Sequence, residues 1–207
     1  MVGAVFALGL LAFAKAPPPA AVPTRRVLVR VDTGTARKTV RIDDVIRGVN
    51  AIWKPYADIT FADASDHSRG GSDDELHLVV TERAQFDAAG APALGWISFV
   101  KPGQPLNLIT VSVAAARTLM AREAWMGRPF PQLPAFIQQD LIARAISWSV
   151  AHEIGHYLLQ SNSHSPYGLM RDSIDAREIA DLRTGAFRLD RESQAFLAAK
   201  SLASRSE

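Results

Sequence analysis

The histidines of this chain are concentrated in one short stretch: of its five histidines, His152, His156 and His164 fall close together. His152 and His156 are spaced i and i+4, so on a helix both imidazoles project from one face and can bind the same metal ion. Glu153 lies beside the first of them, where a carboxylate can take a proton from a metal-bound water. The spacing therefore predicts a metal site with His152, His156 and His164 as ligands and Glu153 as general base.

The segment His152-Glu153-Ile154-Gly155-His156 has the H-E-x-x-H pattern that is typical of zinc-dependent hydrolases, chiefly peptidases. We therefore expect Zn²⁺ as cofactor and hydrolysis of peptide bonds as the reaction, carried out by a zinc-activated water. The alternative is a buried helix with two hydrogen-bonded histidines. That interpretation leaves the adjacent acid and the third nearby histidine as coincidences.

Two other assignments of the ligands stay open. In thermolysin-like enzymes a glutamate from a later helix completes the zinc site, and Glu178, with Asp181 nearby, fits that description. A non-catalytic secreted zinc-binding module would close all four positions with protein ligands, so it needs a fourth from His67, His77 or an acid. Otherwise His67 is expected in a solvated loop, and His77 in a strand packed against a helix. Glu153 argues against a structural site, which has no use for a base.

Composition excludes several classes of function. The chain of 207 residues is 48% hydrophobic, which allows one domain with a sizeable core. Its 23 basic and 21 acidic side chains nearly balance, so we expect no nucleic-acid partner. The absence of cysteine excludes disulfides, cysteine-ligated zinc and a thiol nucleophile.

The first residues are typical of a targeting segment. Residues 2–14 are apolar and uncharged, small residues around 12–16 offer cleavage sites, and 17–23 are rich in proline. We expect residues 1–24 to be a signal peptide, or an N-terminal membrane anchor, with a linker, and 25–207 to be the catalytic domain of a secreted or periplasmic protein. No other segment approaches the roughly 20 apolar residues that a membrane-spanning helix needs.

The hydrophobic periodicity predicts the elements that position these residues. We expect strands at 26–31, 57–62, 75–81, 94–100 and 106–113, and helices at 42–53, 114–125, 135–159, 173–182 and 190–203. The helix at 135–159 is apolar on nearly all sides before His152, which predicts a central, buried position. Gly155 is costly inside a helix, so we expect another segment to pack closely there.

This order of elements, with the motif and the Gly168-Leu169-Met170 turn, resembles the metzincin metallopeptidases, which include the matrixins and astacins. The resemblance implies an α+β fold in which a mixed, twisted five-stranded sheet packs on a long buried zinc-binding helix, with helices at the C-terminus. It also implies a metalloendopeptidase with Met170 as a structural Met-turn beneath the metal. A peptide substrate would pair with the edge strand at 95–100.

The chain departs from the metzincin motif H-E-x-x-H-x-x-G-x-x-H at two positions. Leu159 replaces the glycine, and Asn162 stands where the third histidine is usual, so that His164 comes two residues late. We expect a longer exit from the helix to absorb this, with Asn162 in the left-handed conformation that glycine usually supplies. Considered alone, Met170 is equally well explained as a core methionine.

Overall fold

The structure is a computed structural model, which describes residues 25–66, 74–86, 90, 92–181 and 187–203. The segment 1–24, which we expected to be a signal peptide or anchor, and His67 lie outside these residues. Within them, five strands form one sheet in the order β2-β1-β3-β5-β4. The strands are β1 (Arg25–Asp32), β2 (Ala57–Asp63), β3 (Asp74–Thr81), β4 (Gly95–Lys101) and β5 (Gln104–Ser112), so all five predicted strands are confirmed.

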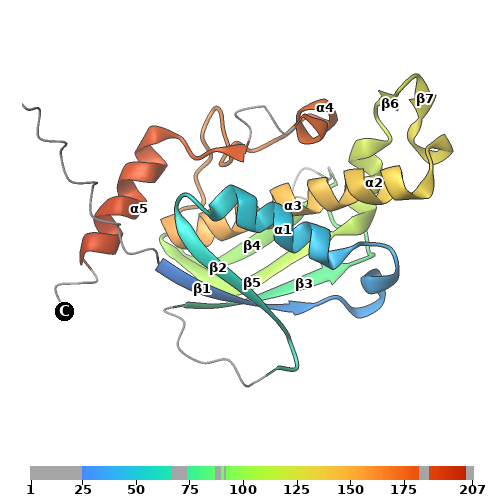
Figure 1. Cartoon of the computed structure of the whole chain (residues 1–207). Coiled ribbons are helices and arrows are strands. Elements are labelled where there is room, and N and C mark those ends of the chain that lie inside the picture. The colour runs from blue at the N-terminus through green and yellow to red at the C-terminus, as the bar shows by residue number, and fades with distance from the viewer. Residues whose placement is uncertain (1–24, 67–73, 87–89, 91, 182–186, 204–207) are drawn as a thin grey trace, which may run out of the picture.

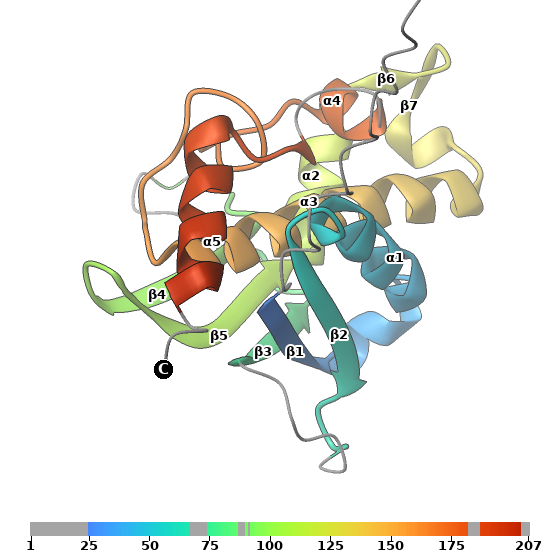
Figure 2. The ribbon, with the colours of Figure 1, turned by 60° about the vertical axis from the view of Figure 1, so that its left-hand side comes forward.

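The sheet is mostly parallel. Strand β1 pairs in parallel with β2 and β3, and β3 pairs in parallel with β5. Strand β4 runs antiparallel to β5, to which a hairpin turn connects it, and forms one edge. The turn of this hairpin contains Gly103 with φ +80°, a conformation that a side chain would strain. Figure 2 shows the hairpin extending past the rest of the sheet beneath the C-terminal helix.

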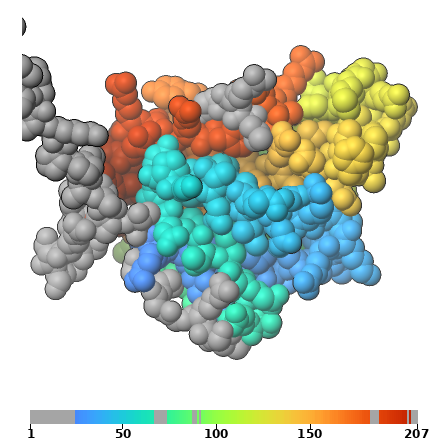
Figure 3. Space-filling view, viewed as in Figure 1, coloured from blue at the N-terminus to red at the C-terminus, as the bar shows by residue number. Residues whose placement is uncertain are grey.

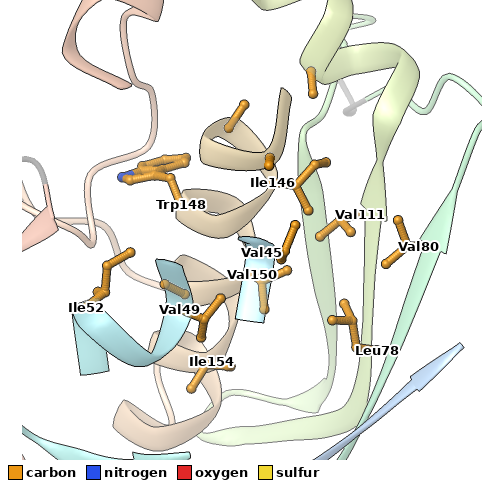
Figure 4. Close-up of a cluster of buried hydrophobic side chains, with 14 of the residues drawn as sticks. Val45, Val49, Ile52, Leu78, Val80, Val111, Ile146, Trp148, Val150 and Ile154 are labelled. Atoms are coloured by element: carbon orange, nitrogen blue, oxygen red, sulfur yellow. The ribbon is translucent and has the colours of Figure 1, made fainter. Parts of the chain in front are cut away.

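The hydrophobic core lies between the sheet and two helices, α1 (Ile42–Trp53) and α3 (Ala135–Leu159), which lie over one face of the sheet (Figure 1). Side chains from α1, α3, β3 and β5 meet in this layer (Figure 4). The indole Nε1 of Trp53 donates to the Ala151 carbonyl at 3.1 Å, which fixes α1 against the segment that carries the motif. Figure 3 shows α1 and β2 on one side of the molecule, with C-terminal residues above them.

Helix α3 has the bounds that the sequence predicted, and its second half is buried on all sides. It ends at Gln160, whose φ of 52° and ψ of 39° are left-handed, and whose N–H bonds the carbonyls of His156 and Tyr157. Asn162 does not have the left-handed conformation we expected, since Met126 and Gln160 are the described non-glycine residues with positive φ. The chain thus turns immediately at the helix end rather than two residues later.

Two predicted helices are shorter in the structure. Helix α2 (Val113–Met120) ends where the Trp125 indole donates to the Met120 carbonyl at 2.9 Å, and a small hairpin of β6 (Ala124–Trp125) and β7 (Arg128–Pro129) follows. Helix α4 (Ala176–Ala180) starts only at a capping box on Asp175, and the expected end at 182 lies outside the described residues. Helix α5 (Arg191–Ala203) agrees with the prediction. None of the helices in the described ranges is long and apolar enough to cross a membrane.

Candidate metal centre

Three imidazoles meet at the end of helix α3. One ligand nitrogen from each of His152, His156 and His164 lies within 4.8 Å of the others. His152 and His156 are buried, each 5% exposed, whereas His164, on the loop after the helix, is exposed. The cluster is therefore buried on the side of His152 and His156 and open to solvent on the side of His164. The structure brings together all three histidines that the sequence singled out.

Backbone carbonyls fix the orientation of the two buried rings. Nδ1 of His152 lies 2.8 Å from the Leu169 carbonyl oxygen, and Nδ1 of His156 lies 2.6 Å from the Ser161 carbonyl oxygen. Because a carbonyl can only accept, each Nδ1 carries the proton and each Nε2 keeps a free lone pair. Metal-binding histidines characteristically have such an outer partner on the second nitrogen.

The two free lone pairs face each other, with the Nε2 atoms 2.9 Å apart. Burial lowers the pKa of His152 to about 3, and burial also lowers the pKa of His156, so both rings are neutral at pH 7. Two neutral acceptors at this distance repel unless a cation or proton lies between them. Tetrahedral Zn–N bonds of about 2.0–2.1 Å place two ligand nitrogens roughly 3.3–3.4 Å apart. The two Nε2 atoms would therefore need to move apart only slightly to bind zinc.

Aromatic rings surround the cluster. The His152 ring stacks on Trp148 at 5.0 Å between centroids and on His164 at 5.3 Å, so it lies between the two. Phe99 of β4 meets the His156 ring edge-on at 6.4 Å. Neither aromatic residue was predicted from the sequence to lie at the site. Trp148 could have been found, since it lies one helical turn before His152, but Phe99 comes from a distant strand.

Glu153 lies on the same helical turns but does not belong to the ligand cluster. Its side chain is buried, and burial raises its pKa to about 8, an effect opposed by a hydrogen bond from the Ile97 backbone N–H. Among the described residues, the cluster includes no acid or fourth histidine. Glu153 is thus a buried carboxyl, adjacent in sequence to a ligand candidate and available for proton transfer.

Met170 lies directly against the motif helix. A Cβ built at Gly155 would overlap the Met170 sulfur and lie 3.0 Å from its terminal methyl carbon. This confirms the expectation that another segment packs closely on Gly155. The turn is closed by the Ser165 N–H, which donates to the Met170 carbonyl at 2.8 Å, and Gly168 supplies a φ of +80°. Met170 is also part of the buried core, so a core role and a position near the cluster coincide.

The alternative ligands lie elsewhere. The Glu178 carboxylate accepts from Arg171 at 3.0 Å and from the Asp175 N–H at 3.2 Å, where it caps α4. In the described part of the chain, Glu178 does not belong to the group of potential metal ligands that contains His152 and His156. His77 is exposed on β3 between buried Leu76 and Leu78, so our expectation that it packs against a helix was wrong. It faces away from the helical layer, and His67 lies outside the described residues.

Comparisons with known proteins give one informative match. No model of a protein family matches the chain, and no curated protein matches it. Among solved structures, a zinc-dependent peptidase from Methanocorpusculum labreanum (strain Z) is similar, with a TM-score of 0.52 over 83% of this chain and 99% of that one. The two sequences are 13% identical, so the likeness shows a shared fold.

Proposed function

We propose that this protein is a zinc-dependent peptidase in which His152, His156 and His164 hold Zn²⁺. The observation that carries the proposal is the convergence of three imidazole nitrogens within 4.8 Å, with Nδ1 of both buried rings engaged by carbonyls. Three protein ligands leave one position for water or substrate, which is the arrangement of catalytic rather than structural zinc. The fold shared with a zinc-dependent peptidase supports the same conclusion.

The residues divide the chemistry between them. Zinc, when bound, lowers the pKa of a coordinated water and polarises the carbonyl of the scissile bond. Glu153 accepts the proton of that water and delivers it to the leaving amine. Burial raises the pKa of this carboxyl to about 8, and a cation bound beside it would lower that pKa and favour the carboxylate form that accepts the proton. The exposed side at His164 is where substrate enters.

We further propose that the protein is a divergent metzincin-like endopeptidase that binds an extended peptide along β4. Two features support this: Met170 packs beneath the motif helix at Gly155, and β4 is an antiparallel edge strand. An edge strand offers unpaired backbone groups to an added strand. Phe99, edge-on to His156, places this strand beside the metal ligands.

The test compares Glu153→Gln with Glu178→Gln, each loaded with zinc. We expect Glu153→Gln to bind one zinc ion per chain and to lose about 10²–10⁴-fold in turnover of a mixed-peptide substrate, because the general base is gone. Glu178→Gln, whose carboxyl caps α4, serves as the matched control and should keep both zinc and activity.

Two results would contradict the proposal. Wild-type protein that takes up no zinc after reconstitution would exclude the metal site. If the zinc-loaded protein cleaves none of the peptides, the protein is a zinc-binding module instead.

A further inference from the structure

The hydrogen-bond pattern of β4 determines which of its amides face away from the sheet. The Ser112 N–H donates to the Leu94 carbonyl at 2.8 Å, and in this register Gly95 pairs with Val111 and Ile97 with Ile109. Hydrogen-bonded and non-hydrogen-bonded pairs alternate along an antiparallel ladder. The pairs of Gly95 and Ile97 are therefore non-hydrogen-bonded, and the N–H of Ile97 points away from β5, toward the free edge.

The Ile97 N–H has a specific acceptor at that edge, the carboxyl group of Glu153. The contact joins an edge strand to the buried acid of α3, two elements far apart in the sequence. A buried carboxylate needs hydrogen-bond donors from the protein, because it has lost most of its contact with bulk water. The ladder geometry and the acceptor thus agree on the direction of this amide.

Gly95 explains how the strand comes close enough. A Cβ built there would overlap the Ser149 hydroxyl oxygen of α3 and lie 3.2 Å from the Thr110 carbonyl oxygen. Ser149 lies one helical turn before Glu153, so the backbone of β4 runs directly against the turn that leads to the acid. A side chain at position 95 would displace the Ser149 hydroxyl or move the strand away from the helix.

We propose that the segment Gly95–Ile97 of β4 is a positioning element for Glu153: the Ile97 N–H holds the carboxyl group, and Gly95 permits the close approach of strand and helix. The catalytic consequence rests on the proposed peptidase function, whereas the contact itself does not. A substrate strand added to β4 would find the Ile97 N–H already engaged. Glu153 and the substrate would then both contact the free edge of β4, so a shift of β4 would move both together.

The contact can be tested without activity, by amide hydrogen exchange at Ile97 in the whole protein. An amide at a free strand edge exchanges quickly, whereas one bonded to a buried carboxyl is protected. We expect a slow Ile97 amide in the wild type and at least tenfold faster exchange in Glu153→Ala. An Ile97 amide that exchanges as fast in the wild type as in Glu153→Ala would overturn the proposal.

Two glycine variants separate positioning from general packing. Gly95→Ala and Gly48→Ala each place a Cβ against a serine hydroxyl of α3, that of Ser149 or that of Ser147. We expect Gly95→Ala to lose Ile97 protection, and Gly95→Ala/Ser149→Ala to regain most of it, whereas Gly48→Ala leaves it unchanged. Equal loss of Ile97 protection in Gly95→Ala and Gly48→Ala would refute a specific role of Gly95.

The catalytic consequence is tested by Ile97→Pro, which removes the donor without breaking the β5 ladder, compared with Ile97→Ala, which keeps it. We expect Ile97→Pro to have at least tenfold lower kcat than Ile97→Ala, with zinc content and KM alike. Equal kcat values would refute the positioning role. If the wild type cleaves no peptide, the peptidase proposal fails, and the exchange experiment still decides whether β4 holds Glu153.

Discussion

Adding a methyl group at Gly155 tests the packing beneath the metal cluster. In Gly155→Ala the new Cβ would overlap the Met170 sulfur and lie 3.0 Å from its methyl carbon, where carbon atoms normally approach to about 3.5–4.0 Å. Trp53, at 3.7 Å, is already at ordinary contact distance. The Met170 side chain must therefore move, and it belongs to the turn whose Leu169 carbonyl holds His152.

The magnitude follows from two opposing effects. Overpacking a well-packed site costs about 1–3 kcal/mol. Replacing glycine by alanine inside a helix stabilises the helix by about 1 kcal/mol. We expect a net loss of about 1 kcal/mol in the free energy of unfolding, which lowers Tm by roughly 2–4 °C in a protein of this size.

The assay is a double-mutant cycle of Gly155→Ala and Met170→Ala, followed by thermal and denaturant unfolding. Met170→Ala alone should cost about 2–5 kcal/mol, since it empties a buried site. In that background the clash is gone, so Gly155→Ala should stabilise by about 1 kcal/mol through helix propensity alone. This change of sign is the decisive observation. Gly155→Ala that stabilises the wild type as much as it stabilises Met170→Ala would refute the packing of Met170 on the helix.

Three further outcomes are expected. His164→Ala should weaken zinc binding by more than the about 10–100-fold that loss of an outer-shell partner costs, whereas Glu178→Ala should leave it nearly unchanged; metal titration with the reverse ranking would favour a glutamate ligand. The Arg171 guanidinium lowers the folded-state pKa of Glu178, so the stability lost in Glu178→Gln should be present above pH 4.5 and vanish as pH falls through the lowered value; urea unfolding across pH that shows the opposite trend would contradict the ion pair. Trp53→Phe should cost about 1–3 kcal/mol, because it leaves a void and removes the donor to the Ala151 carbonyl; an unchanged unfolding midpoint would refute that anchor.

Local periodicity was sufficient to predict most elements. Helices α1 and α3 begin and end where the spacing of apolar residues predicts, because this signal acts within a turn or two of the chain. Helices α2 and α4 were predicted too long. Their ends are fixed by contacts outside local periodicity: the indole of Trp125 on the last turn of α2, and the capping box at Asp175.

The candidate site also combines residues that local spacing predicts with residues that it does not place. His152, Glu153 and His156 lie on one helix, so their spacing alone predicts two facing imidazoles and an adjacent acid. His164 was predicted as the third ligand, with Glu178 as the alternative, but spacing alone does not determine where a residue beyond the helix lies. The choice depended on how the loop after Gln160 folds back, with Glu178 drawn instead to Arg171 and the cap of α4.

The sequence by itself determined the chemical groups and the helix face on which two of them lie, because helical geometry is a local property of the backbone. Only the tertiary structure decided which distant groups complete them. The Leu169 and Ser161 carbonyls, Met170 beneath Gly155 and the Ile97 amide beside Glu153 all reach the helix from other segments. Such contacts depend on the path of the whole chain, and the free energy that forms them comes from burying the common core rather than from any one motif.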